Sequence, residues 1–378
     1  MISLLLLGLV AAKVDYSQYR VERFNITSAG DLAVLKAFVS GKQIDAWSPL
    51  SVGLVDLRLG PDQRAPSGLL SHVLIENLQT AIEKESKKPV GRAAAEFTQS
   101  YHSIDEMYAW MDKIGSTFTV GKSYLGHDIR GVKIGPDSAK FKLVAHGGIH
   151  AREWIAPATI IHMIDALKSK EIGQFQFHLI PVANPDGYEY SRTTDRMWRK
   201  NRQPIPGSSC IGTDNNRNWG FEWRKEGLHC EEMFSGTGPF STPETKAISE
   251  YILKVRPIAY FDMHSYGNLF MSPFAYTCST RAKDFFHQDA AAKKAVAAIA
   301  ASSGRVYKQG TICDVIYPAH GSSADWAYMT ANVKYSYGIE LPGDFREGFI
   351  VSPSKIPSIG EETLAGFQAV VDFIQQNE

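Results

Sequence analysis

The chain has 378 residues, enough for two domains or for one large and one small domain. Hydrophobic residues make up 44% of it and charged residues 21%, which is typical of globular proteins and excludes a disordered chain. Because 40 basic residues balance 40 acidic ones, the formal net charge is +0, and neither nucleic acid nor an anionic membrane is indicated as a partner.

The first 12 residues form an apolar run that ends in two alanines. We expect residues 1–12 to be a secretory signal peptide. The run is short and lacks a positive charge, so a truncated leader or a buried strand is the alternative. No other segment has about 20 consecutive apolar residues, which predicts a soluble protein.

Four cysteines, and no Cys-x-x-Cys pair, point to an oxidising compartment and up to two disulfides. Cys210 and Cys230 would close a polar, glycine-rich loop. The alternative is a cytosolic protein in which all four cysteines, Cys210, Cys230, Cys278 and Cys313, are free buried thiols. That alternative conflicts with the leader.

Residues 17 to about 88 are expected to form a small domain. The pattern predicts a strand at 19–26, a helix at 29–39, a strand at 52–59 and further strand or helix at 69–82. Strand-helix-strand-strand-helix-strand in about 70 residues predicts an α+β, ferredoxin-like sandwich. The charged, then Pro- and Gly-containing stretch 83–95 predicts a linker, either a site for a trypsin-like protease or a plain solvated tether.

Helices and strands alternate from residue 97 onward, beginning with a capping box at Ser103 and Glu106. This alternation predicts an α/β domain whose mixed sheet is covered on both faces. We expect strands at 118–122, 129–134, 141–145, 175–183, 258–263 and 334–341, and helices at 104–115, 155–164, 245–255, 289–303 and 359–376.

The strand at 141–145 runs into a turn with two glycines, followed by the predicted helix. His150 and Glu153 lie in this turn, three residues apart, where a sheet edge meets a helix N-terminus. An imidazole and a carboxylate at this spacing can occupy two coordination positions of zinc. By itself the pair is weak support, because such a pair arises by chance in a chain with 11 His and 40 acids.

Catalytic groups in such sheets collect at strand ends. The apolar strand 258–263 ends in His264, the natural third ligand, and strand 334–341 carries Glu340 near its end. A carboxylate there is costly to bury without a partner or a function. Each residue alone could simply pair with a neighbour. Their convergence with His150 and Glu153 favours a metal site.

A series of further motifs follows in order along residues 97–378. The sequence resembles the secreted zinc metallocarboxypeptidases of the pancreatic A/B type, which are made as proenzymes. The resemblance implies a mixed sheet of the eight-stranded type behind a ferredoxin-like prodomain. The matching motifs are His150-Ala151-Arg152-Glu153-Trp154, Asn184-Pro185-Asp186-Gly187-Tyr188, Trp198-Arg199-Lys200, Asp214-Asn215-Asn216-Arg217-Asn218-Trp219, Pro239-Phe240-Ser241, His264-Ser265-Tyr266, Ile316-Tyr317, Asp325-Trp326 and Ile339-Glu340-Leu341.

The resemblance implies that His150, Glu153 and His264 bind one zinc ion, with water as the fourth ligand. Glu340 then corresponds to the general base that deprotonates the water and passes the proton to the leaving amine.

Other positions match residues that contact the substrate or support the metal ligands. Arg199 resembles the residue that stabilises the oxyanion, and Asp214 the acid that orients His150. The clamp on the substrate's C-terminal carboxylate corresponds to Asn216, Arg217 and Tyr317; the outer subsites and cleft correspond to Arg152, Arg196, Phe349, Ser265 and Tyr266.

Ala324 matches the position at the base of the side-chain pocket, which is acidic in B-type enzymes and apolar in A-type ones. The other pocket positions are Met271, Ala275, Ile312 and Gly338. An apolar pocket predicts bulky aliphatic or aromatic C-terminal residues. Asp314 would redirect specificity if it pointed inward.

The resemblance also implies an activation propeptide at 13–92 and a catalytic domain at 93–378. Tryptic cleavage is expected after Arg92, with Lys87 or Lys88 as alternatives. Cys210–Cys230 and Cys278–Cys313 are the implied disulfides. The expected protein is a monomer secreted to a digestive lumen, and it acts on the C-termini of peptides.

Two other readings remain: a secreted binding protein that keeps the fold without catalysis, and a B-type enzyme. The first would lack a ligand or the base, and here His150, Glu153, His264 and Glu340 are all present. Ala324 argues against the second.

Overall fold

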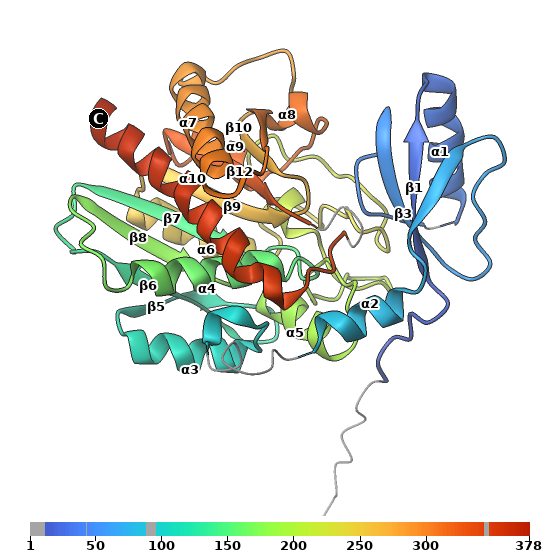
Figure 1. The fold of residues 1–378 in the computed structure, drawn as a ribbon, viewed down its shortest axis with the longest axis horizontal. Coiled ribbons are helices and arrows are strands. Elements are labelled where there is room, and N and C mark those ends of the chain that lie inside the picture. Colours follow the sequence, from blue (N-terminus) through green and yellow to red (C-terminus); the bar gives the residue numbers. More distant parts are fainter. Residues whose placement is uncertain (1–11, 43, 88–95, 344–347) are drawn as a thin grey trace, which may run out of the picture.

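The computed structural model describes residues 12–42, 44–87, 96–343 and 348–378 (Figure 1). Residues 1–11 of the expected signal peptide, and the expected cleavage sites Lys88 and Arg92, lie outside the described residues. A small domain with a four-stranded sheet lies at one end of the molecule, to the right in Figure 1, beside a large domain with an eight-stranded sheet.

The small domain packs one face of its sheet on α1, where Leu35 meets Phe24, Val55 and Leu57. Its sheet order is β2-β3-β1-β4, with every pair antiparallel. The elements are β1 (Arg20–Ile26), α1 (Ala29–Lys42), β2 (Asp45–Ala46), β3 (Gly53–Leu59), β4 (Leu70–Ile75) and α2 (Leu78–Glu85).

The predicted element order of this domain is wrong in its second half, because the second helix follows the last strand. Pro61 and Pro66 lie between β3 and β4, and neither can donate a backbone hydrogen bond, so that stretch stays a loop. Helix α2 instead begins after Asn77, whose side chain accepts a hydrogen bond from the Thr80 N–H.

The large sheet has the order β11-β10-β12-β9-β7-β8-β6-β5, and the expected mixed sheet is confirmed. Strands β12, β9, β7 and β8 are parallel and form its centre. Every residue of β8 and β9 is buried, as expected for strands covered on both faces. The bounds are β5 (Thr117–Lys122), β6 (Asp128–Ile134), β7 (Phe141–Gly147), β8 (Phe175–Ile180), β9 (Ala259–Ser265), β10 (Leu269–Ser272), β11 (Lys308–Thr311) and β12 (Tyr335–Leu341).

Helices cover both faces of this sheet and enclose two hydrophobic cores. The larger core lies under α3 (Ile104–Ile114), α4 (Ile155–Leu167), α7 (Phe285–Ser303) and α10 (Ile356–Asn377). The smaller lies under α6 (Pro243–Val255) and α9 (Ser323–Met329). The remaining helices are α5 (Pro185–Thr193) and α8 (Ile312–Val315), with short 3₁₀ turns η2 (Phe97–Gln99), η3 (Asn215–Arg217) and η4 (Pro353–Lys355).

Local signals set several of these boundaries. The capping box of Ser103 and Glu106 is present at the start of α3, and Gly304 ends α7 in the left-handed conformation. Both expected disulfides form, Cys210–Cys230 and Cys278–Cys313. Over the described residues, no helix combines the length and apolar character needed to cross a membrane.

Two glycines shape the turn between β7 and α4. A Cβ on Gly147 would lie 2.8 Å from the carbonyl carbon of Ala156, closer than van der Waals contact allows. Gly148 has φ of 65°, a conformation that other residues adopt only at a cost. The chain therefore passes tightly from the sheet edge into α4, which places the residues of the turn above the end of β7.

His178 in β8 gives a test of this buried sheet. Its ring lies between the Tyr251 hydroxyl, 2.6 Å from Nδ1, and Gln176 Oε1, 3.0 Å from Nε2. Burial, together with Lys133 and Lys142, lowers the pKa of His178 to about 4. The neutral ring is therefore the form that the folded protein holds.

We expect the free energy of unfolding to fall as the pH drops from about 6.5 to about 4, because the unfolded chain binds a proton at His178 before the folded one does. The contribution of this group is on the order of 3 kcal/mol. Denaturant unfolding at a series of pH values measures it. His178→Gln should reduce the dependence of the free energy of unfolding on pH between about 4 and about 6.5, whereas His287→Gln, at an exposed histidine, should leave it unchanged. The same pH dependence in His178→Gln and in the wild type would contradict the prediction.

Candidate metal centre

Three side chains predicted from the sequence as ligands meet at the carboxyl ends of β7 and β9. His150 and Glu153 come from the turn before α4, and His264 is the penultimate residue of β9. His150 Nδ1 lies 2.8 Å from Glu153 Oε1. His264 Nδ1 lies 3.1 Å from His150 Nδ1 and 3.2 Å from Glu153 Oε2. All three side chains are buried, at 3–6% exposure.

This donor set fits zinc. Two imidazole nitrogens and a carboxylate are typical ligands, and donors about 2 Å from a tetrahedral ion lie about 3.3 Å from one another. A bound cation would also offset the cost of burying the Glu153 carboxylate, whose nearest arginine nitrogen, Arg199 Nη1, is 3.8 Å away. His150, Glu153 and His264 are therefore the residues that would hold the metal.

Asp214 supports His150 from behind, as the resemblance implies. Its Oδ1 lies 3.1 Å from His150 Nε2, so the ring can donate its N–H there and turn Nδ1 toward the centre. Its Oδ2 accepts a hydrogen bond of 2.8 Å from Arg199. Burial alone would raise the pKa of Asp214, but the Arg199 guanidinium and His150 hold it well below its usual range.

Glu340 lies on β12 directly beside His264 of β9, with which it is in register. Its Oε2 is buried and has no hydrogen-bond partner among the described residues. Burial, reinforced by Glu153 and opposed by His264 and Arg199, raises the pKa of Glu340 to about 8. One oxygen of this carboxyl group, on the residue next to His264 in the sheet, is thus free of structural hydrogen bonds among the described residues, as a proton-transfer group requires.

Asn216, Arg217 and Tyr317 also lie together. Arg217 donates to the Tyr317 hydroxyl at 2.8 Å and to the carbonyl of Asn216 at 2.8 Å. The Asn216 amide nitrogen lies 3.0 Å from His264 Nε2, so this cluster adjoins the metal ligands.

Three of the predicted pocket residues, Met271, Gly338 and Ile312, lie close to one another. Met271 on β10 pairs with Gly338 on β12, and a side chain at Gly338 would begin 3.6 Å from Ile312 Cδ1. The Ala275 N–H donates to Asp325, the residue after Ala324. Ala324 itself is 1% exposed, and its methyl side chain puts no charge at that position.

Asp314 does not turn into this pocket. Its carboxylate accepts from Thr311 Oγ1 at 2.8 Å and pairs at 2.7 Å with Arg281, at the surface. The possibility that Asp314 redirects specificity is therefore wrong for this conformation. His320, in the loop after Tyr317, pairs at 2.7 Å with Glu226.

Residues of the small domain contact the outer residues of the predicted cleft. Arg152 Nη1 donates to both oxygens of Asp45, at 3.0 and 2.9 Å, and its guanidinium stacks on Phe349. The Trp47 ring meets Phe349 edge to face, with centroids 5.1 Å apart. Asp45 is the first residue of β2 and Trp47 directly follows this strand, so β2 and its end are the part of the small domain that lies against these residues.

Two further contacts extend this interface. Arg196 forms a two-pronged ion pair with Glu85 of α2, at 2.7 and 2.8 Å. The Tyr266 hydroxyl donates to Asp56 of β3 at 2.8 Å. Within the large domain, Ser265, another predicted cleft residue, donates its N–H to Glu153 at 3.2 Å. The sequence reading did not identify Asp45, Asp56 or Glu85, because isolated acids in a small domain carry no periodic or spacing signal.

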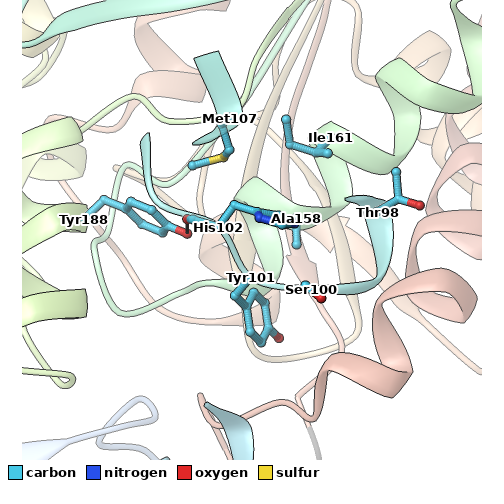
Figure 2. A pocket seen from close by; sticks show the side chains of 8 residues that line it. All are labelled: Thr98, Ser100, Tyr101, His102, Met107, Ala158, Ile161 and Tyr188. Atoms are coloured by element: carbon cyan, nitrogen blue, oxygen red, sulfur yellow. Dashed lines mark hydrogen bonds between the residues drawn. The ribbon is translucent and has the colours of Figure 1, made fainter. Parts of the chain in front are cut away.

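A separate cavity lies away from these residues, between the segment 98–102, α3, α4 and α5 (Figure 2). Its volume is about 10 Å³, room for no more than about one water molecule. The Tyr188 hydroxyl closes one side by donating to the His102 carbonyl at 2.8 Å. This cavity is a packing feature and not a substrate site. Its walls are Thr98, Ser100, Tyr101, His102, Met107, Ala158, Ile161 and Tyr188.

The fold and the buried His-Glu-His set define a zinc peptidase of the carboxypeptidase class. The family model described as "Zinc carboxypeptidase" matches residues 100–366. The chain belongs to this family, and the resemblance seen in its motifs is confirmed. It is a metallocarboxypeptidase.

Relatives of this chain carry both A and B names. The chain is 36% identical to "Zinc carboxypeptidase A 1" of Anopheles gambiae over 324 residues, covering 79% of this chain and 74% of that protein. It is 32% identical to "Carboxypeptidase B" of Bos taurus over 398 residues, 95% of this chain and 94% of that one. The crystal structure of carboxypeptidase A from Helicoverpa armigera superposes with a TM-score of 0.87 at 25% identity, covering 96% of this chain and 98% of that chain.

We expect the protein to bind one zinc ion per chain and His264→Ala to weaken binding by at least about 100-fold, since a third of the protein's donors is lost. Competition with a coloured chelator measures the dissociation constant. His72→Ala, at an exposed histidine of the small domain, is the control. Unchanged zinc binding by His264→Ala would show that the ion is held elsewhere.

Proposed function

We propose that the protein is an A-type carboxypeptidase that releases bulky aliphatic or aromatic residues from peptide C-termini and is secreted as a zymogen. One observation carries the proposal. Arg217 is buried, at 7% exposure, yet among the described residues it forms no ion pair with a carboxylate. A buried guanidinium beside a metal centre, bonded only to neutral oxygens, suits an incoming carboxylate.

That carboxylate is the substrate's C-terminus in this proposal. Arg217 presents a planar fork of donors, and the Tyr317 hydroxyl lies within hydrogen-bonding distance of it. Asn216 links this clamp to His264. A clamp next to the centre places the last peptide bond of a chain at the metal, which restricts cleavage to chain ends.

Zinc, when bound, would supply a Lewis acid that polarises the scissile carbonyl and lowers the pKa of water. Glu340, adjacent to His264 in the sheet, would accept the proton of the attacking water and pass it to the leaving amine. Arg199, whose Nη1 lies 3.8 Å from Glu153, would donate to the oxyanion. Asp214 holds the Arg199 guanidinium in place before the substrate arrives.

The side-chain preference follows from the pocket walls. Met271, Ile312 and Ala324 offer apolar surface, and Gly338 leaves room above Ile312. A buried Lys or Arg side chain would meet no acid at Ala324, and leaving such a charge unpaired is costly. An aliphatic or aromatic side chain gains from the same burial.

The small domain fits the role of an inhibitory propeptide. Asp45 forms an ion pair with Arg152, Glu85 forms one with Arg196, and Trp47 packs on Phe349. These three catalytic-domain residues are the proposed outer contacts for a peptide, so the docked domain and an extended substrate compete for them. The proposed propeptide is residues 13–92, removed by a trypsin-like protease after Arg92.

Secretion is supported by the apolar N-terminal run and by the two disulfides, which persist in oxidising compartments. We propose a digestive lumen as the site of action, with peptide and protein C-termini as substrates. The enzyme would act there as a monomer.

The central test uses trypsin-treated protein and peptides that end in Phe, Leu, Lys or Glu. We expect release of Phe and Leu at least about tenfold faster than of Lys, because an apolar pocket rejects an unpaired charge. A chelator should abolish all release. Absence of release would overturn the exopeptidase proposal, and release of Lys alone would overturn the A-type assignment.

Ala324→Asp is the matched specificity variant. It places a carboxylate at a buried position of the pocket, so Lys release should rise and Phe release should fall. Unchanged preference would show that this position does not contact the substrate side chain.

The zymogen proposal is tested at Asp45. Removal of one partner from a buried ion pair costs about 3–5 kcal/mol, so Asp45→Asn should shift the uncut chain toward an undocked propeptide. We expect its basal hydrolysis of a small chromogenic peptide to rise at least about tenfold. Asp62→Asn, at an exposed aspartate of the same domain, is the control. A basal rate equal to wild type would contradict inhibition through this contact.

A further inference from the structure

Asp262 is a buried carboxylate for which the proposed mechanism has no role. It lies two positions before His264 on β9, so the two side chains share a face of the sheet. Its exposure is 0%. Burial of a carboxylate in the central strand of a sheet is costly unless a partner compensates.

The partner of Asp262 is the candidate metal ligand itself. Asp262 Oδ2 lies 3.0 Å from His264 Nε2, while Nδ1 of the same ring faces His150 and Glu153. The Asn216 amide nitrogen also lies 3.0 Å from Nε2, and it can only donate, because the amide oxygen accepts from the Ser323 N–H. With Nδ1 as the ligand atom, Nε2 carries the proton of the neutral ring and needs an acceptor. Of these two groups, only Asp262 can accept the Nε2–H.

Asp262 is held by residues from two other elements. Ser323, the first residue of α9, donates its hydroxyl to Asp262 Oδ2. His146 of β7 is in register with Asp262, and its Nδ1 lies 3.4 Å from Oδ1. Nε2 of His146 lies 2.5 Å from the Tyr260 hydroxyl, which fixes that ring in turn. The hydrogen bond from Ser323 of α9 therefore fixes Oδ2, and the His146 ring of β7 lies beside Oδ1 without a hydrogen bond to it.

Charge balance separates Asp262 from Asp214. Asp214 has Arg199 as a cationic partner, whereas the ion-pair partners of Asp262 in the described part of the chain are the imidazoles of His146 and His264 alone. An imidazole bound to a dication through Nδ1 carries partial positive charge at Nε2–H. A metal on His264 would thus supply the charge that the buried carboxylate lacks.

We propose that Asp262 is a positioning residue for the metal, which holds His264 in the tautomer with Nε2–H and aims the Nδ1 lone pair at the centre. Each of the two imidazole ligands then has its own carboxylate, Asp214 behind His150 and Asp262 behind His264. Carboxylates in this place raise ligand basicity and commonly contribute 10–100-fold to metal affinity. The inference rests on the proposed assignment of His264 as a ligand.

Asp262→Asn in the full chain tests the inference, because it removes the charge and nearly preserves the shape. We expect the zinc dissociation constant, measured by chelator competition, to rise about 10–100-fold. The absorption bands of the cobalt-substituted protein, which report ligand geometry, should shift. The control is Glu362→Gln, because Glu362 is a buried carboxylate of α10 that pairs with Arg305 away from the centre. This variant should change neither the zinc dissociation constant nor the cobalt absorption bands.

A purely structural role would lower the melting temperature of the zinc-free protein without this loss of affinity, so that temperature is measured in parallel. A dissociation constant within twofold of wild type overturns the inference. Should Asp262→Asn not fold, Asp262→Ser keeps a hydroxyl without the charge and carries the same expectation. Failure of the wild type to bind zinc, or undiminished binding by His264→Ala, would instead refute the proposed function.

Discussion

Charge compensation at one edge of the large sheet is the constraint on which the rest of the structure depends. Glu153, Asp214, Asp262 and Glu340 are gathered around two imidazoles at the carboxyl ends of β7, β9 and β12. Such a concentration of buried acids is unfavourable without cations. Arg199 supplies one positive charge from the protein. A bound metal ion would supply the positive charge that these acids still need, which is why this edge of the sheet suits a metal and not a packed apolar core.

The same constraint explains how the small domain lies on the large one. Arg152 and Arg196 are buried at the interface, and each finds its carboxylate in the small domain, at Asp45 and Glu85. Arg217, in the cluster that adjoins the candidate metal ligands, has no such partner within the described residues. The two guanidinium groups at the domain interface are thus neutralised by the small domain, while Arg217 is hydrogen-bonded only to neutral oxygens.

Much of the fold was predictable because its signals are local. The capping box at Ser103, the stop at Gly304 and the apolar runs of β7 and β9 each act within a few residues. Errors occurred where the signal was weak. Strands β10 and β11, the last two at one side of the large sheet, have only four residues each. In the small domain the second helix follows β4, because the stretch with Pro61 and Pro66 between β3 and β4 is a loop. Both disulfide pairs followed from the family resemblance and not from spacing.

The sequence by itself determined the chemistry of the centre. His150, Glu153, His264 and Glu340 follow from a turn motif and two strand ends, since parallel strands end at a common edge. Only the tertiary structure decided which acidic residues lie beside these residues as hydrogen-bond or ion-pair partners. Asp262 reaches His264, and Asp45 reaches Arg152 across 107 residues, through strand register and domain docking, and neither leaves a periodic pattern in the chain. Contacts between distant segments depend on how whole elements pack, which no local spacing records.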